Sequence, residues 1–370
     1  MPIGGAMNYV RNTWYVAGWT QDLEVNKPFS ITILGEPVVI WRNSDNALTA
    51  LEDRCVHRLA PLSLGRCEGQ KLRCMYHGLL YDRTGAVTEI PGQDLIPPHA
   101  KVRAYPVCEK HSWIWVWMGD AAACDESLIP PAVGYDNPNY ILGHGQMDYA
   151  AEARLIDDNL LDFSHLSYVH INSFGANDEW ARVRPKITPL PNGVRVERWL
   201  MDTAGTSRVS FHGPGERYSR YDFLLPGVLL MTGGVFPIGT SAGLNNEAPD
   251  LELAEGAVTF TSQAVTPLTA KTSRYFFSWG PHRKHGDAAL RDTLMGIAHK
   301  AFAEDRTMIE AQQRVIDMTL EPRIMPTSAD RAITLFNQLV AKRCREETNK
   351  PAAGSQAAAV AQGRPTAAAG

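Results

Sequence analysis

The amino-acid sequence predicts an α+β protein of two domains, the first of them all-β. Residues 8–120 are dense in short apolar runs separated by turn residues, which is typical of strands at close spacing. Later segments combine strand-like alternation at 184–280 with helical spacing at 288–319. A chain of 370 residues accommodates two domains of roughly 150 residues each. We therefore expect domains at 8–120 and 121–345, followed by a disordered tail at 346–370.

The prediction for the first domain depends on its strand candidates and on the turns between them. The interruptions carry Gly, Pro, Asn and Asp, as in the Asn-Ser-Asp-Asn segment at 43–46. This pattern favours a small sandwich or barrel. The strand candidates are 14–19, 29–34, 37–41, 48–51 and 113–117.

The second domain is predicted to mix helices and strands. Residues 150–167 carry apolar side chains at helical spacing with few helix breakers, and alternation at 193–199 and 257–265 predicts strands. The stretch 288–319 is predicted as one long amphipathic helix. Its apolar residues are Leu290, Leu294, Ile297, Ala301, Met308 and Ile309.

Composition and charge restrict the classes of function. The formal net charge of −4, without a long basic run, argues against nucleic acid and a membrane surface as partners. The sequence contains no apolar stretch of about 18 residues and no secretory signal, so no transmembrane helix is expected. Six cysteines at irregular spacings then indicate reduced thiols, and we expect a cytoplasmic protein. Met1 and Met7 are both candidate start residues.

Two short motifs in the first domain each offer one thiolate and one imidazole. They are the pair Cys55 and His57 and the pair Cys74 and His77. A [2Fe–2S] cluster with two cysteines on one iron and two histidines on the other suits this set, and the imidazoles raise its potential. A structural zinc site uses the same ligand types, and four unrelated core residues are the remaining alternative. The strand-rich context, without a helix carrying HxxxH, favours the cluster.

The segments around these motifs resemble the Rieske signature of bacterial ring-hydroxylating and demethylating oxygenases. They read CVHRLAPL at 55–62, CMYHGLLYD at 74–82 and EIPGQ at 89–93. The resemblance implies that Cys55, His57, Cys74 and His77 bind a Rieske [2Fe–2S] cluster.

A second group of candidate ligands lies in the second domain. His165 and His170 are five residues apart, too far for one face of a helix, so the helix is expected to end or loosen between them. Two histidines and one carboxylate leave positions on a non-haem iron open for O₂ and substrate. The block 157–170 resembles the iron-binding helix of the same family. The resemblance implies that both histidines bind Fe(II) and that Asn159 lies near them.

The carboxylate of this group is expected from the long C-terminal helix. Asp305 stands at the position of the family's iron carboxylate within the segment AEDRTMIEAQ at 303–312. Glu304 and Glu310 are the alternatives on the same helix.

Asp162 is the candidate link between the two centres. It lies three residues before His165, on the same helix face. The resemblance implies that this aspartate connects the iron site to a Rieske histidine of the neighbouring subunit, and His77 is the matching histidine. A carboxylate that accepts from the second nitrogen of a metal-bound histidine also orients the ring. The alternative is a helix-capping or solvated aspartate.

The resemblance extends from Val10 to about Ala341 and is closest to the aromatic-acid subgroup that includes vanillate O-demethylase oxygenase, dicamba monooxygenase and toluenesulfonate methyl-monooxygenase. It implies a homotrimer in which a Rieske β domain precedes a domain with an antiparallel sheet flanked by helices. Electrons would come from a separate flavin and iron–sulfur NAD(P)H reductase, and O₂ would hydroxylate a methoxy or methyl group of a small aromatic substrate. A ring-dihydroxylating dioxygenase and a Rieske electron-transfer protein are the alternatives.

The substrate pocket is expected between residues 155–161 and the strands of 200–280. An anionic aromatic substrate would need an arginine, histidine or amide partner there. Gln263 stands where a histidine contacts the substrate carboxylate in one relative.

Overall fold

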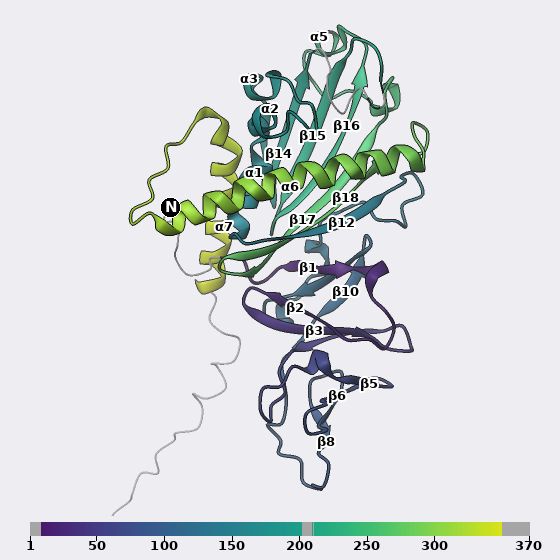
Figure 1. Cartoon of the computed structure of the whole chain (residues 1–370), viewed down its shortest axis with the longest axis vertical. Helices are drawn as coiled ribbons and strands as arrows, with labels where there is room; N and C mark the ends of the chain where they lie inside the picture. The colour runs from purple at the N-terminus through teal and green to yellow at the C-terminus, as the bar shows by residue number, and fades with distance from the viewer. Residues whose placement is uncertain (1–8, 202–208, 210, 350–370) are drawn as a thin grey trace, which may run out of the picture.

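In the computed structural model, an all-β part of the chain lies against one side of a larger α+β part (Figure 1). The structure describes residues 9–201, 209 and 211–349. The candidate start residues lie outside the described residues, as does 350–370, which is most of the expected tail. The last helix continues to Asn349, past the domain boundary expected at 345.

Within the described residues, the N-terminal part forms three small antiparallel sheets. One has the order β1-β11-β10, with β1 at Trp14–Trp19, β10 at Val107–Lys110 and β11 at Trp113–Trp117. The second has the order β2-β3-β4-β9, at Phe29–Ile33, Glu36–Arg42, Leu48–Glu52 and Ala104–Tyr105. The third has the order β5-β6-β7-β8, at Arg66–Glu68, Lys71–Arg73, Leu80–Tyr81 and Val87–Glu89. The expected strands at 14–19 and 113–117 are thus confirmed, and β11 is buried along its whole length.

The second part of the chain contains, among the described residues, a seven-stranded antiparallel sheet with the order β12-β18-β17-β16-β15-β14-β13. Its strands are β12 (Gly143–Tyr149), β13 (Lys186–Leu190), β14 (Gly193–Leu200), β15 (Glu216–Leu224), β16 (Val228–Phe236), β17 (Thr259–Thr269) and β18 (Thr272–Pro281). The helices are α1 (Ala153–Leu161), α2 (Leu166–Val169), α3 (Glu179–Arg182), α5 (Thr240–Gly243), α6 (Ala288–Met318) and α7 (Arg331–Asn349). Short 3₁₀ turns lie at Thr20–Asp22, Leu62–Leu64, Ala121–Ala123, Glu126–Leu128, Phe163–His165, Leu251–Leu253 and Ser328–Asp330.

The long helix α6 crosses one face of this sheet (Figure 1). It begins after Asp287, whose carboxylate accepts a hydrogen bond from the N–H of Leu290 at 2.9 Å and so caps the first turn. Its buried residues include Leu294, Ala301 and Ile309 of the six apolar positions read from the sequence, whereas Leu290 and Ile297 are half-buried and Met308 is exposed. The helix expected at 288–319 is therefore confirmed, and it carries Asp305 to the centre of the fold.

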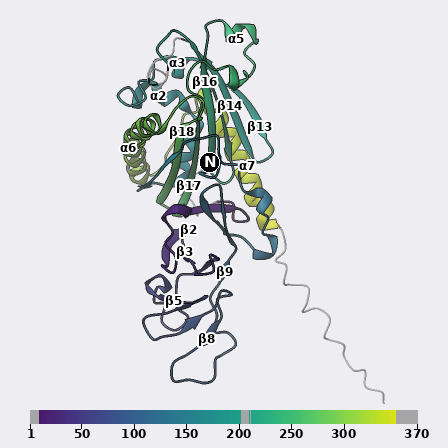
Figure 2. The same ribbon diagram turned by 90° about the vertical axis from the view of Figure 1, so that its right-hand side faces the viewer.

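Strand β18 contributes alternate side chains to two different cores, one on each face of the sheet. Phe277 packs against Phe302 of α6, with ring centroids 4.7 Å apart. Phe276 points the other way and contacts Trp19 of β1, with ring centroids 6.3 Å apart. Because successive strand residues face opposite sides, the sheet holds the helices on one face and the N-terminal sheets on the other (Figure 2).

Hydrogen bonds also join the two parts beside this shared core. The hydroxyl of Thr266 donates to the carbonyl of Val16 at 2.6 Å, and the N–H of Leu34 donates to the carbonyl of Pro267 at 2.9 Å. Among the helices of the described residues, none combines the length and apolar composition that a membrane crossing requires.

We predict that Phe276→Ala lowers the free energy of unfolding by about 3–5 kcal/mol, because the side chain is fully buried where the two parts meet and its loss leaves a cavity. Urea unfolding followed by circular dichroism measures the change. Leu320→Ala is the control, since Leu320 is 100% exposed and its truncation should change little. Equal unfolding midpoints for the two variants would contradict a shared core.

Candidate metal centres

The two Cys/His loops of the N-terminal part have the same backbone conformation. In each, the cysteine N–H donates to the carbonyl five residues further on, at 2.8 Å for Cys55 and 2.9 Å for Cys74. The N–H four residues after the cysteine donates back to the cysteine carbonyl, at 2.9 Å in both loops. That fourth residue is Leu59 or Gly78, and both have a positive φ, of 59° and 77°. A leucine in this conformation is uncommon, which indicates that the loop shape is imposed for a purpose.

The matched loops place two thiols inside and two imidazoles outside. The side chains of Cys55 and Cys74 are buried, and the rings of His57 and His77 are exposed with centroids 4.5 Å apart. The hydroxyl of Tyr81 donates to the Cys55 sulfur at 3.1 Å. This donor set fits a cluster whose cysteine-bound iron is buried and whose histidine-bound iron lies at the surface.

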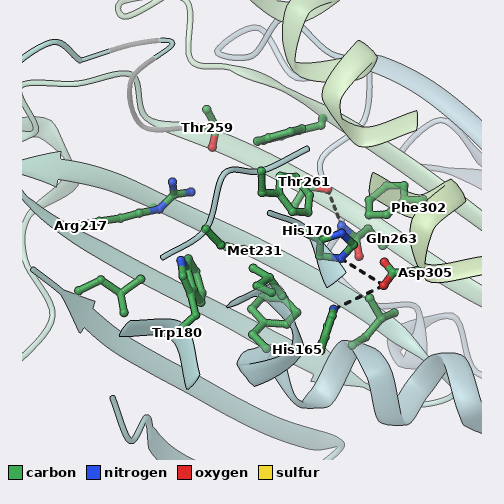
Figure 3. A pocket seen from close by; sticks show the side chains of 18 of the residues that line it. His165, His170, Trp180, Arg217, Met231, Thr259, Thr261, Gln263, Phe302 and Asp305 are labelled. Atoms are coloured by element: carbon green, nitrogen blue, oxygen red, sulfur yellow. Dashed lines mark hydrogen bonds and ion pairs between the residues drawn. The ribbon is translucent and has the colours of Figure 1, made fainter. Parts of the chain in front are cut away.

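The second group of predicted ligands converges between α1 and α6. The metal-binding atoms of His165, His170 and Asp305 all lie within 4.8 Å of one another. The Asp305 Oδ1 atom is 3.1 Å from His170 Nε2 and 3.5 Å from His165 Nε2 (Figure 3). The structure therefore brings together the three side chains that the sequence proposed as one iron site.

The Nδ1 atom of each histidine ring is hydrogen-bonded to an oxygen of the protein. His165 Nδ1 lies 2.6 Å from the backbone carbonyl oxygen of Asp162, and His170 Nδ1 lies 3.0 Å from a carboxylate oxygen of Glu304. Neither oxygen donates, so both Nδ1 atoms carry a proton, and in the neutral form of each ring the Nε2 lone pair is left for a metal. The Ser173 hydroxyl donates to the same Glu304 oxygen at 2.5 Å.

The electrostatics of the site favour a bound cation. Burial lowers the pKa of the His165 imidazole, which keeps it in the neutral form that binds metals. Burial also acts to lower the pKa of His170, but Asp305 and then Glu304 outweigh it and raise that pKa. Two carboxylates thus attract positive charge to this point.

Within a single chain, Asp162 contacts His165 through its backbone carbonyl and not through its carboxylate. Helix α1 ends at Leu161, and Asp162 has extended dihedral angles (φ −124°, ψ 99°), so the chain leaves the helix once before His165. Helix α2 then ends at Val169, so the helix end expected between His165 and His170 is confirmed. The Asp162 carboxylate accepts from the N–H and the hydroxyl of Ser164, at 2.8 and 2.9 Å. The expectation that this carboxylate orients His165 is therefore wrong. The backbone carbonyl of Asp162 orients the His165 ring instead.

The remaining candidates divide between contact with the site and other roles. The Asn159 amide donates to Asp305 Oδ1 at 3.1 Å and lies 3.4 Å from His165 Nε2, so it adjoins the ligand atoms. Glu304 accepts the hydrogen bond from His170 Nδ1, on the side of the ring away from Asp305. Glu310 instead accepts from the backbone N–H of Ala150 at 3.0 Å. Of the three acids considered on α6, Asp305 alone faces both Nε2 atoms.

A mostly apolar pocket opens beside the triad, between the sheet and helices α1, α3 and α6 (Figure 3). Its polar lining includes Gln263 and Thr261 from the region expected in the sequence, and Asn177 from outside that region. Its apolar walls are Leu160, Phe163, Leu166, Phe174, Ala176, Trp180, Leu200, Met201, Met231, Phe277, Trp279 and Phe302.

Sequence reasoning missed one charged residue of this pocket, Arg217 on β15. The signal was strand periodicity, because Arg217 shares the parity of Tyr221 and Phe223, which belong to the core under the helices. A charged residue in that alternation points inward.

Comparison with known proteins agrees with both centres. The Rieske [2Fe-2S] domain family matches residues 13–106, and the family described as vanillate O-demethylase oxygenase C-terminal domain matches residues 149–346. The iron–sulfur subunit of the toluene-4-sulfonate monooxygenase system of Comamonas testosteroni is 35% identical over 347 residues, which cover 92% of this chain and 98% of that protein. The chain belongs to the vanillate O-demethylase family of Rieske oxygenases.

Other members of this Rieske oxygenase family show the same extent of similarity. The vanillate O-demethylase oxygenase subunit of a Pseudomonas species is 31% identical over 341 residues, covering 87% of this chain and 91% of that subunit. A crystal structure of dicamba monooxygenase bound to 3,6-dichlorosalicylic acid superposes with a TM-score of 0.82 at 26% identity, covering 92% of this chain and 99% of the other. The family and the fold expected from the sequence are thus confirmed.

The cofactors of a Rieske oxygenase fit the residues present. Two buried thiols and two exposed imidazoles match the [2Fe–2S] cluster, and two neutral Nε2 donors beside a carboxylate match a mononuclear Fe(II). The assignment of Cys55, His57, Cys74 and His77 to the cluster and of His165, His170 and Asp305 to the iron stays a prediction.

We predict that His165→Ala or His170→Ala removes one iron per chain and leaves the visible spectrum of the cluster unchanged, because the two sites lie in different parts of the fold. Asp305→Ala should weaken iron binding less, since two imidazoles remain. Iron analysis after dialysis measures the loss, with Glu310→Ala as the control on the same helix. Full iron content in both histidine variants would refute the assignment.

Proposed function

We propose that this chain is the terminal oxygenase component of a Rieske monooxygenase that hydroxylates a methyl or methoxy substituent of a small aromatic compound. The observation that carries the proposal is the position of the triad in the wall of the apolar pocket, where a substrate carbon can lie beside a metal held by His165, His170 and Asp305.

The residues around the site bind the substrate, exclude water and fix the ligand geometry. When bound, the cluster and the iron supply electron transfer and the activation of O₂. Aromatic side chains such as Phe302 and Trp180 provide surfaces for a ring, and the apolar walls limit the access of water to the reacting carbon. Hydroxylation of a methoxy carbon gives a hemiacetal that collapses to a phenol and formaldehyde, whereas a methyl carbon gives an alcohol.

The names of the relatives support this class of substrate and a separate electron donor. They are the iron–sulfur subunit of a toluene-4-sulfonate monooxygenase system and an oxygenase subunit of vanillate O-demethylase. Both names describe one subunit of a larger system, which fits a separate NAD(P)H reductase. The sequence of this chain shows no Gly-rich nucleotide-binding fingerprint of its own.

We further propose that electrons pass between chains of a homotrimer, from His77 of one chain to Asp162 of the next. The loops at β5–β8 lie at the opposite end of the chain from α2 and α3 in Figures 1 and 2, which does not favour a route within one chain. The Asp162 carboxylate has further acceptor sites beyond those used by Ser164, so it can also accept from an imidazole.

Exposed apolar side chains at both ends of this proposed route support contact between copies. A head-to-tail contact of this kind closes naturally into a ring. The exposed residues at the cluster loops are Val56, Leu59, Met75 and Tyr76, and those next to the iron site are Tyr168 and Ile171.

A cytoplasmic location belongs to the same proposal. None of the six cysteines, all of which lie in the described residues, forms a disulfide, which suits a reducing compartment.

The function is tested with the purified oxygenase, a Rieske-oxygenase reductase and NADH, supplied with toluene-4-sulfonate, vanillate and other methoxybenzoates. We expect substrate-dependent oxygen uptake with one hydroxymethyl product, or one formaldehyde, for each NADH consumed. A cis-diol that retains both oxygen atoms, or no response to any methyl- or methoxy-substituted aromatic, would overturn the proposal.

The intersubunit route predicts rescue in mixed rings. His77→Ala and His165→Ala chains should each be inactive alone, because one lacks an intact cluster and the other lacks the iron. Co-expression places an intact cluster of one chain beside an intact iron site of its neighbour, so part of the activity should return. Activity of mixed rings isolated with two affinity tags measures the effect, and absence of rescue would refute the route. Asp162→Asn should keep both metal sites and lose turnover.

A further inference from the structure

The pocket beside the triad contains a half-buried cation that the proposed chemistry does not use. Among the described residues that line it, Arg217 is the one side chain outside the triad that carries a permanent charge. Its guanidinium lies 5.9 Å from the centre of the Trp180 ring. Figure 3 shows Arg217 and the triad on opposite sides of the pocket, with Trp180 and Met231 between them.

The strand register explains why this charge faces the pocket. Arg217 is paired with Leu200 of β14 and Val235 of β16, and its side chain lies on the face of the sheet that carries Tyr221 and Phe223. Arg220, three residues further on, lies on the opposite face. The fold therefore directs one of these two arginines into the pocket and the other away from it.

A guanidinium in this position is suited to an anion. Burial lowers the pKa of Arg217 to about 10, so the group remains charged at neutral pH although it has lost much of its water. Arg217 interacts with other residues of this chain, but a guanidinium offers five N–H donors and can bind an anion as well. Its planar fork matches the paired oxygens of a carboxylate or a sulfonate.

Gln263, the pocket position named from the sequence, already has hydrogen-bond partners within the chain. The Gln263 amide oxygen accepts from the hydroxyl of Tyr275 at 2.6 Å, and its nitrogen donates to the hydroxyl of Thr261 at 3.1 Å. That hydroxyl donates in turn to the carbonyl of Ser278 at 2.6 Å. Gln263 therefore belongs to a buried hydrogen-bond chain within the sheet.

We propose that Arg217 binds the anionic group of the substrate, and that the substrate class is an aromatic carboxylate or sulfonate whose methyl or methoxy group lies on the far side of the ring from the anion. With the anion at Arg217, the ring lies beside Trp180 and Met231, and the substituent reaches the triad. This inference rests on the proposed function, because it assumes that the reacting carbon lies at His165, His170 and Asp305.

The first test uses the wild-type holoenzyme without oxygen and measures ligand binding by titration calorimetry. Toluene-4-sulfonate is compared with the uncharged toluene-4-sulfonamide, and 4-methylbenzoate with 4-methylbenzamide. In at least one pair, the anion should bind about 10- to 100-fold more tightly, the size expected for one charge-assisted pair. The pair with the larger ratio identifies the anion, and equal affinities within both pairs would overturn the proposal.

The second test asks whether Arg217 causes that preference. Arg217→Gln should reduce the ratio to near one, Arg217→Lys should retain part of it, and Arg220→Gln is the matched control that should keep it. The visible spectrum of the cluster and circular dichroism verify the fold of each variant. A full anion preference in a folded Arg217→Gln variant would overturn the proposal.

Turnover separates this inference from the proposed function. With reductase and NADH, Arg217→Gln should raise the KM for the anionic substrate by a larger factor than that for the uncharged analogue, whereas Arg220→Gln should change neither. Anion binding that depends on Arg217 without any hydroxylated product would refute the proposed oxygenation and leave the anion site standing.

Discussion

The break in the chain after α1 is the local feature on which the iron site depends. Asp162 adopts an extended conformation, so its carbonyl leaves the helical pattern and accepts from His165 Nδ1 at 2.6 Å. Its carboxylate begins the next turn by accepting from Ser164. One residue therefore ends a helix, starts a turn and orients a ligand, and the two histidines follow at the spacing that lets both Nε2 atoms face Asp305.

The seven-stranded sheet connects the iron site to the rest of the chain. One of its faces supports α1 and α6, and the other face supports the N-terminal sheets. The two histidines lie in the turn and the short helix α2 that follow α1, and Asp305 lies in the middle of α6. Since Phe276 and Phe277 are adjacent residues in different cores, the two parts are fixed relative to each other rather than joined by a loose linker. The cluster loops consequently lie at the far end of the same chain, which supports the proposed transfer of electrons between neighbouring chains (Figure 1).

The sequence predicted what depends on local pattern. The strand at 113–117 and the helix at 288–318 follow from periodicity, and the ligand pairs follow from short spacings that only a few metal sites use. Interactions between residues far apart in the chain were not predictable in this way. Glu304 contacts a histidine 134 residues earlier, and the pairing of three strands decides which residues lie beside Arg217. The helix end between His165 and His170 was predicted, but the earlier break at Asp162 was not, because the spacing of the two histidines gives no information about the residues before them.

The central claim is that one chain holds two separate iron centres and that the second is bound through both Nε2 atoms and Asp305. Anomalous diffraction from crystals of the purified protein at the iron absorption edge tests it most directly. The account predicts one peak between Cys55, His57, Cys74 and His77 and a second peak within bonding distance of His165 Nε2, His170 Nε2 and the Asp305 carboxylate. A peak at the cluster alone, or a second iron bound through Nδ1 or through Glu304, would contradict it.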